Sequence, residues 1–140
     1  LAACPELELL DLSSNGLGDA GARAVAGALA ACPELELLDL SSNGLGDAGA
    51  RAVAGALASV PKLRVLNLFG NFSLGDAGGR AVAGALASVP KLEKLHLWHR
   101  SRGGEAEAEV RAAWADGGAR PKDGLNGPAD LLDIRDLRYD

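Results

Sequence analysis

The first 56 residues of this chain are one 28-residue sequence written twice without a difference. Residues 1–28 and 29–56 share every letter, and residues 57–85 form a third copy with one extra residue. A fourth copy begins at Leu86 and then loses the pattern. One such unit cannot close a core of its own, so repetition at this period indicates an array in which each unit packs on its neighbours. We therefore expect a solenoid of stacked coils.

Each copy contains one short leucine-rich phrase. In the second copy it runs Leu35-x-x-Leu38-x-Leu40-x-x-Asn43-x-Leu45. Leu38 and Leu40 are two residues apart, so they share one face of a short strand. Asn43 ends the strand, and its amide carries both donors and an acceptor for the backbone groups of two neighbouring coils. The predicted structural ladder consists of Asn15, Asn43 and Asn71.

A helix is expected after each strand. The turn Gly-Leu-Gly-Asp ends in a residue type that is favoured as a helix N-cap. In the second copy Gly49, Val53 and Leu57 recur every four residues, which marks the buried face of the helix. A proline at an equivalent place in each copy stops the helix before the next coil. The predicted helix caps are Asp19, Asp47 and Asp76.

The phrase resembles the leucine-rich repeat, and its 28-residue length is similar to that of the ribonuclease-inhibitor-like subfamily. The resemblance implies an α/β fold, a short right-handed horseshoe with parallel strands on the concave side and helices on the convex side. It also implies that a protein partner binds the concave face. We divide the chain into four repeats, 1–28, 29–56, 57–85 and 86–115, followed by a C-terminal cap or tail, 116–140.

The pattern changes from the fourth copy onward. Arg100 occupies the ladder position and Arg102 an inward leucine position, which predicts that this coil is rebuilt as a cap. Trp114 replaces the leucine of a helix and is expected to seal the end of the core. The last apolar cluster can dock as a cap or serve as a partner-binding peptide, and we favour the cap. It consists of Leu131, Leu132, Ile134 and Leu137.

In the first two coils the outward strand positions hold only leucine, aspartate and serine, whereas in the last two they include aromatic, histidine and lysine side chains. Exposed aromatic residues on a sheet face are enriched in binding hot spots, so this cluster is the candidate partner-binding site. The alternative, equally weighted, is that the C-terminal tail folds back over the aromatic residues. The candidate concave residues are Val65, Asn67, Phe69, Lys94, His96, Trp98 and His99.

The sequence offers no constellation for catalysis or for a cofactor. His96 and His99 do not converge well on a strand end and have no third ligand nearby in sequence, so we expect no metal site. The phrase GLGDAG lacks the lysine of a phosphate-binding loop. Cys4 and Cys32 occupy equivalent places that Val60 fills in the next copy, which indicates packing and not redox chemistry. We expect no enzyme.

Charge and composition narrow the class of partner. A net charge of −5 argues against sequence-blind binding of nucleic acid. No apolar run approaches the roughly 20 residues of a membrane span. Two cysteines give no disulfide framework, which favours an intracellular, cytoplasmic location. The acidic residues 1–56 precede the basic residues 57–100, a distribution that could steer a partner or support head-to-tail self-association.

These observations predict a protein–protein interaction module that recognises its partner through the concave face. One alternative is a structural subunit wedged into a larger assembly. Another is a consensus-type designed solenoid with no ligand, because consensus repeats are readily designable.

Overall fold

Strands and helices alternate along the chain in the order that the repeat predicts. The computed structural model describes residues 4–97, 104–116 and 125. The strands are β1 (Leu9–Asp11), β2 (Leu37–Asp39), β3 (Val65–Asn67) and β4 (Lys94–His96). The helices are α1 (Gly18–Ala28), α2 (Asp47–Ala56), α3 (Asp76–Ala85) and α4 (Gly104–Ala115). Single 3-10 turns extend the first three helices, namely η1 (Leu29–Ala31), η2 (Leu57–Ser59) and η3 (Leu86–Ser88).

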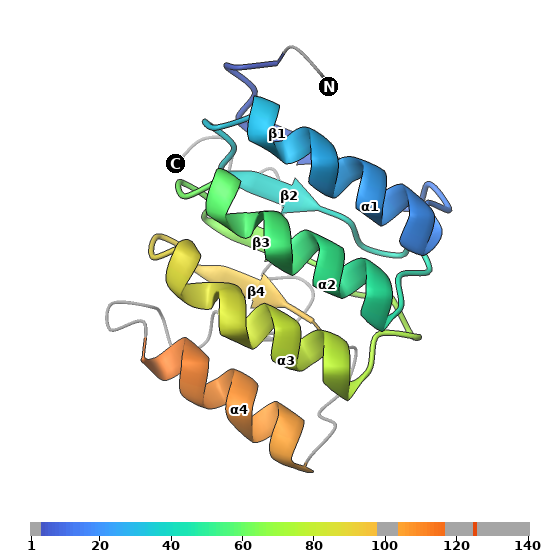
Figure 1. Cartoon of the computed structure of the whole chain (residues 1–140), viewed down its shortest axis with the longest axis vertical. Coiled ribbons are helices and arrows are strands. Elements are labelled where there is room, and N and C mark those ends of the chain that lie inside the picture. Colours follow the sequence, from blue (N-terminus) through green and yellow to red (C-terminus); the bar gives the residue numbers. More distant parts are fainter. Residues whose placement is uncertain (1–3, 98–103, 117–124, 126–140) are drawn as a thin grey trace.

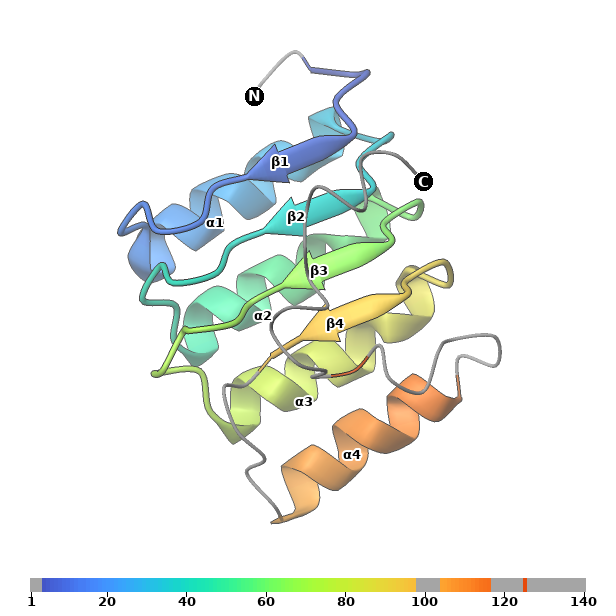
Figure 2. The same ribbon diagram turned by 180° about the vertical axis from the view of Figure 1, so that it is seen from behind.

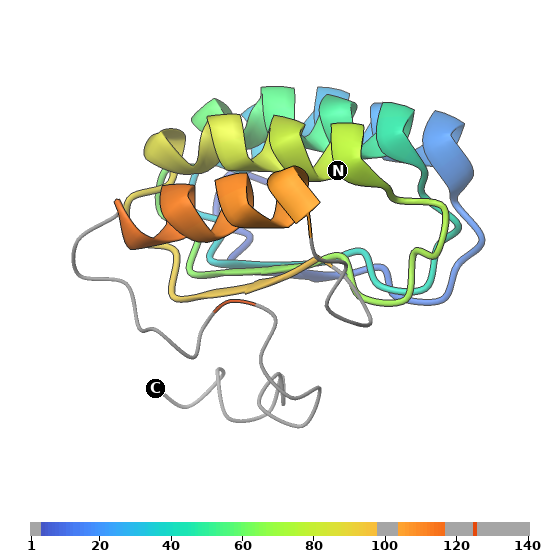
Figure 3. The same ribbon diagram turned by 90° about the horizontal axis from the view of Figure 1, so that it is seen from below.

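The four strands form one parallel sheet in the order β1-β2-β3-β4 (Figures 1 and 2). The helices lie side by side in a second layer, all on the same side of the sheet (Figure 3). Strand pairing places equivalent residues of successive coils in straight rows. The first residues of the four strands form one row, Leu9, Leu37, Val65 and Lys94. The last residues form another, Asp11, Asp39, Asn67 and His96. The expected solenoid architecture is therefore observed.

The hydrophobic core lies between the two layers. The inward leucines of the strand phrase, such as Leu38 and Leu40, are fully buried against the helices. Val53 represents the inner helix face and is buried as well. Trp114 in α4 is buried in the same cluster, which confirms its predicted place in the core. Burial of this kind contributes about 25 cal/mol per Å² of apolar surface, so adjacent coils stabilise one another.

The asparagine side chains connect successive coils. Oδ1 of Asn43 accepts hydrogen bonds from the backbone N–H groups of Asn15 (2.8 Å) and Leu17 (3.3 Å) in the coil before it. Its Nδ2 donates to the carbonyl oxygens of Leu12 and Ser41. Asn71 makes three corresponding bonds one coil further on, and its fourth bond is donated to the carbonyl oxygen of Leu68 in its own coil. Each amide thus satisfies main-chain groups that the strand and turn leave without a regular partner.

The aspartates bind a different helix from the one that the sequence predicts. The N-caps of α1, α2 and α3 are Leu17, Gly46 and Gly75, and none makes a side-chain cap bond. Asp19 and Asp47, expected to cap their own helices, lie inside the first turn instead.

Their carboxylates reach the helix of the next coil. Oδ1 of Asp19 accepts from the backbone N–H groups of Gly46 (2.8 Å) and Gly49 (2.9 Å) at the start of α2. Asp47 does the same for α3, through Gly75 (2.7 Å) and Gly78 (2.9 Å). Close packing of the helices brings each carboxylate to the neighbouring positive helix end. Asp76 also lies in the first turn of its own helix, and residues 98–103, which precede α4, are outside the described residues.

Coils one and two have identical sequences but start their helices differently. Gly18 has φ +62° and lies inside α1, whereas the equivalent Gly46 has φ −104° and precedes α2. Gly21 donates to the carbonyl of Leu17 (3.0 Å), whereas the equivalent Gly49 donates to Asp19. The local conformation of this turn is therefore set by the carboxylate of a neighbouring coil and not by the sequence of the turn.

Candidate partner-binding face

The candidate face is the side of the sheet opposite the helices, and it is less open than the sequence suggests. Val65 and His96 were expected to face solvent, but each is only 3% exposed. Asn67, Phe69 and Lys94 are half-buried. Strands β3 and β4 bring these five residues together. The other two candidates, Trp98 and His99, lie outside the described residues, as do Arg100, Arg102 and the apolar cluster of the tail, Leu131, Leu132, Ile134 and Leu137.

The last residues of β1, β2 and β3 accept the same kind of local hydrogen bond. The carboxylates of Asp11 and Asp39 accept the backbone N–H two residues later, at 3.0 and 2.9 Å. Asn67 does the same with the N–H of Phe69 at 2.9 Å. This is the Asx-turn geometry that Asp and Asn favour. Asn67 therefore has a structural role in addition to its predicted place on the face.

Asp39 is the one of these carboxylates that is withdrawn from water, with 4% of its surface exposed. Burial raises the pKa of its carboxyl group above the ordinary value, because desolvation disfavours the charged form. Hydrogen bonds from Ser41 and Asn67 lower the pKa and offset part of that effect, while the nearby charge of Asp11 raises it. Asp11, which holds the same place in an identical coil, is exposed.

This difference predicts a pH-dependent effect of Asp39→Asn. A carboxyl whose pKa is raised on folding favours the folded state below its unfolded pKa and loses that advantage as pH rises through the folded pKa. The asparagine keeps the acceptor for Ser41 but carries no charge. We therefore expect the variant to gain stability relative to the parent between about pH 3.5 and about pH 7. Urea denaturation at both pH values measures it.

Asp11→Asn is the matched control for that experiment. The same substitution at an exposed site should change the pH dependence much less, since water already solvates the charge. A pH dependence that is the same in Asp39→Asn as in the parent would contradict the burial of this carboxylate.

Phe69 and His96 form the aromatic part of the face. Their ring centroids are 4.9 Å apart and the ring planes are inclined by 55°. Tilted pairs at this distance are favourable beyond the area they bury. The pair connects β4 to the segment that follows β3.

The sequence reasoning missed Phe72, which is 80% exposed. It lies at the single insertion in the array, where Asn71-Phe72-Ser73-Leu74 replaces the shorter turn of the other copies. Insertions in solenoids occur in loops on one face, which is often the binding face. The insertion was therefore the signal that could have identified Phe72.

Part of the uneven charge distribution is neutralised by ion pairs between neighbouring coils. Lys62 of the third coil pairs with Glu34 of the second. Arg64 bonds Glu93 at 2.7 Å and lies 3.7 Å from Glu36. At the boundary between the second and third coils, the basic side chains thus offset the charges of Glu34 and Glu36. Exposed pairs of this kind contribute at most about 1 kcal/mol each.

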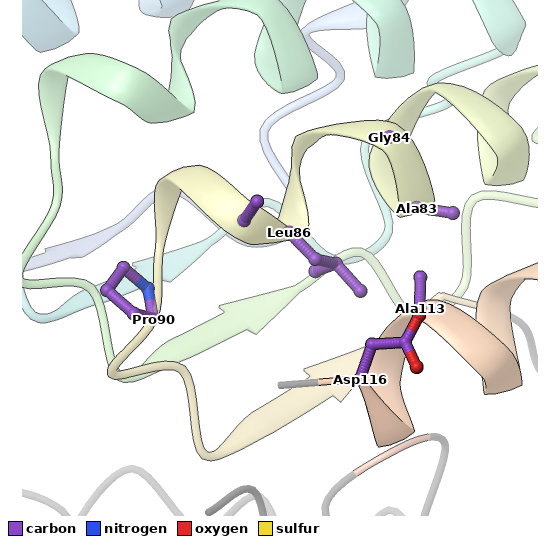
Figure 4. Close-up of a pocket in the computed structure, with 7 residues that line it drawn as sticks. Ala83, Gly84, Leu86, Pro90, Ala113 and Asp116 are labelled. Carbon is purple, nitrogen blue, oxygen red and sulfur yellow. The ribbon is translucent and has the colours of Figure 1, made fainter. Parts of the chain in front are cut away.

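A shallow groove of about 410 Å³ lies on the helix side, between α3 with η3 and the end of α4 (Figure 4). Its walls are small apolar side chains, with one carboxylate at the rim. The lining residues are Ala83, Gly84, Leu86, Ala87, Pro90, Ala113 and Asp116. The groove contains none of the candidate binding residues.

The described part of the chain contains no group of three or more histidine, cysteine, aspartate or glutamate side chains that could hold a metal ion. Among the described helices, none is long and apolar enough to cross a membrane.

Comparisons with known proteins agree with this architecture. A family model described as the leucine-rich repeat matches residues 3–26, 31–54 and 61–83, which is about half of the chain. No curated protein is detectably similar in sequence. A solved structure entitled "Leiomodin-1 Actin-Binding Site 2 (ABS2)" is similar with a TM-score of 0.75 and 21% sequence identity. The match covers 96% of this chain and 78% of the other.

Proposed function

Because the chain belongs to the leucine-rich repeat family, we propose that it is a protein–protein interaction module and that the sheet face opposite the helices recognises the partner. The 28-residue period and a full helix in each of the first three coils support a further assignment to the ribonuclease-inhibitor-like subfamily. The solved neighbour is named for an actin-binding site, so one protein with this fold is described as binding another protein.

The observation that carries the proposal is the exposed aromatic surface of the third coil. Phe72 is largely exposed, and Phe69 is half-buried against His96. Exposed aromatic side chains are costly in water and are common anchors in interfaces. The first two coils have only leucine, aspartate and serine at the corresponding positions. The proposed contact residues are Val65, Asn67, Phe69, Lys94, His96, Trp98 and His99, together with Phe72.

Two single substitutions test the proposal. The intact chain is immobilised, and partners are captured by chemical crosslinking and identified by mass spectrometry. Phe72→Ser removes an exposed ring without disturbing the core, and Phe69→Ser removes the ring that packs on His96. We expect each variant to recover at least about tenfold less of the specific partner, as for a hot-spot anchor.

Arg51→Ala is the control, because Arg51 is exposed on α2 in the helix layer. It should retain the partner, and circular dichroism should show that all three variants are folded. Equal recovery by the phenylalanine variants and the parent would reject this face as the binding surface. Loss of the partner only with Arg51→Ala would assign binding to the helix side.

A further inference from the structure

One arginine from each of the first three helices lies on the outer surface of the helix layer, and together they form the arginine row. Arg23, Arg51 and Arg80 hold the same position in α1, α2 and α3, and each is exposed. The three helices pack side by side on one side of the sheet (Figures 1 and 3). Because packed helices are about 8–10 Å apart, the row repeats a positive charge at about that interval.

Charge in the first two coils is divided between the two layers. Arg23 and Arg51 are the only basic residues among residues 1–56, which contain eight acidic residues. Asp19 and Asp47 lie on the helices, but their carboxylates accept backbone N–H groups at the start of the next helix. The other acidic residues belong to β1, β2 and the segments that precede these strands. The positive charge of these two coils is therefore confined to the helix side.

Within the described part of the chain, ion pairs engage Arg80 but neither Arg23 nor Arg51. Nε of Arg80 lies 2.8 Å from Oε2 of Glu109, and its Nη2 lies 4.0 Å from Glu105. Both glutamates come from α4, which packs beside α3. The fold itself thus provides one example of what the row accepts, namely the carboxylates of an acidic helix.

The surface around the first two arginines is low and open. In α1 and α2, arginine is the only exposed residue whose side chain is larger than a methyl group. Gly27 and Gly55 follow Arg23 and Arg51 by four residues, and a Cβ atom at either glycine would have no neighbour within 4 Å. Another main chain can therefore come close to these helices while the guanidinium groups contact its carboxylates.

We propose that Arg23 and Arg51 form a second interaction surface, which binds an acidic helix of a protein partner with carboxylates two turns apart. Seven residues of a helix rise about 10.5 Å, which is close to the interval between neighbouring arginines. Arginine also matches the planar geometry of a carboxylate. This surface goes beyond the proposed function, because it lies on the opposite side of the sheet from Phe69 and selects a partner by charge.

Phosphate groups are the other anions that arginine binds in proteins. A nucleic acid or an anionic membrane presents them as a continuous negative surface, which the net charge of −5 opposes. The acidic residues of the same two coils add to that repulsion. A helix with a few spaced carboxylates avoids most of it, and so the observations favour a protein partner.

A helical peptide of known sequence tests this surface. The probe is a fluorescein-labelled peptide of about 21 residues, rich in alanine and glutamine, with glutamate at every seventh position. Fluorescence anisotropy measures its binding to the intact chain at about 20 mM salt, where exposed charges are weakly screened. We expect it to bind at least about tenfold more tightly than the same peptide with glutamine at those positions.

Substitutions of exposed arginines locate the binding. Arg23→Gln and Arg51→Gln should each weaken binding of the glutamate peptide about threefold, and together about tenfold. Arg111→Gln is the matched control, because it removes the same charge from the exposed side of α4, outside the row. It should change binding less than about twofold. Circular dichroism verifies that each variant is folded.

Two results would show that the arginines do not read a spaced set of carboxylates. Equal weakening by Arg111→Gln would mean that the peptide responds only to net charge. Equal affinity for a peptide with glutamate at every fifth position, which scatters the carboxylates around the helix, would mean that spacing has no effect. Either result would overturn the proposal.

Two further results would assign the row to another occupant. Binding to phosphatidylserine vesicles or to double-stranded DNA, but not to the glutamate peptide, would mean that the arginines bind phosphate. Self-association of the parent chain that Arg51→Gln abolishes would mean that a second copy covers the row.

The test is independent of the sheet face. Phe72→Ser should bind the glutamate peptide as tightly as the parent does, and Arg51→Ala should still retain the partner of the sheet face. Failure of the peptide to bind therefore leaves the capture experiment on Phe69 and Phe72 unaffected.

Discussion

Replacing Asn71 by alanine should lower the free energy of unfolding by about 4 kcal/mol. The buried amide accepts from the backbone N–H groups of Asn43 and Leu45 and donates to the carbonyl oxygens of Leu40 and Leu68. Alanine leaves these four main-chain groups without that partner, and each buried unsatisfied group costs about 1 kcal/mol or more. Urea denaturation followed by circular dichroism measures the loss.

The control is Asn15→Ala, the same substitution at an exposed position. The amide of Asn15 donates to the carbonyl oxygens of Leu12 and Ser13 in its own coil. Water can replace those bonds, so the expected loss is below about 1 kcal/mol. Equal losses at positions 15 and 71 would show that bonding between coils adds nothing to these amides.

Replacing Gly49 by alanine should destabilise the protein by about 2 kcal/mol, although alanine is the better helix former. A Cβ atom at this position would lie 2.6 Å from Oδ1 of Asp19 and 3.2 Å from Cβ of Ala22. The methyl group therefore pushes the two helices apart or displaces the carboxylate that binds the first turn of α2. Loss of such a cap costs about 1 kcal/mol, and the forced separation adds to it.

Gly55→Ala in the same helix provides the opposite expectation. A Cβ atom there has no neighbour within 4 Å. The substitution should stabilise the protein by up to about 1 kcal/mol, from helix propensity alone. Thermal or urea denaturation of both variants measures the two changes in stability. If both alanines stabilise the fold, then close approach of α1 and α2 at Gly49 is not required.

The sequence predicted those features that depend on the period alone. Leucines at alternate positions placed Leu38 and Leu40 in the core, and the 28-residue spacing aligned Leu37 with Leu9 and Val65 in the sheet. These features follow because side chains alternate along a strand and equivalent residues stack in a solenoid. Trp114 could be placed for the same reason, since it occupies a helix position that is apolar in every copy.

The capping aspartates could not be placed correctly from local rules. A carboxylate before a helix is expected to cap that helix, but close packing gives Asp19 a better set of donors in α2. The two conformations of identical turns at Gly18 and Gly46 show the same limit. Bonds between coils decide both outcomes, and they depend on distances that sequence patterns do not contain.

The candidate site was predicted only in part, for a similar reason. The row positions of Val65, Asn67 and His96 followed from the register. Their exposure did not, because burial depends on tertiary contacts that a repeat pattern does not contain. The β-bridge between Leu125 and Leu95 is one such contact, and no local sequence pattern predicts it.

The hydrogen bonds between coils run in two opposite directions, and this has a consequence for how the array can grow. Asn43 and Asn71 bind the coil before them, and Asp19 and Asp47 bind the coil after them. A 28-residue segment cut at any point therefore contains one member of each kind. The coil encoded by a tandem copy of such a segment can therefore form these bonds with another copy of itself and with both neighbouring coils. Copy number can change by recombination without compensating substitutions, and two coils can remain identical in sequence while the array lengthens.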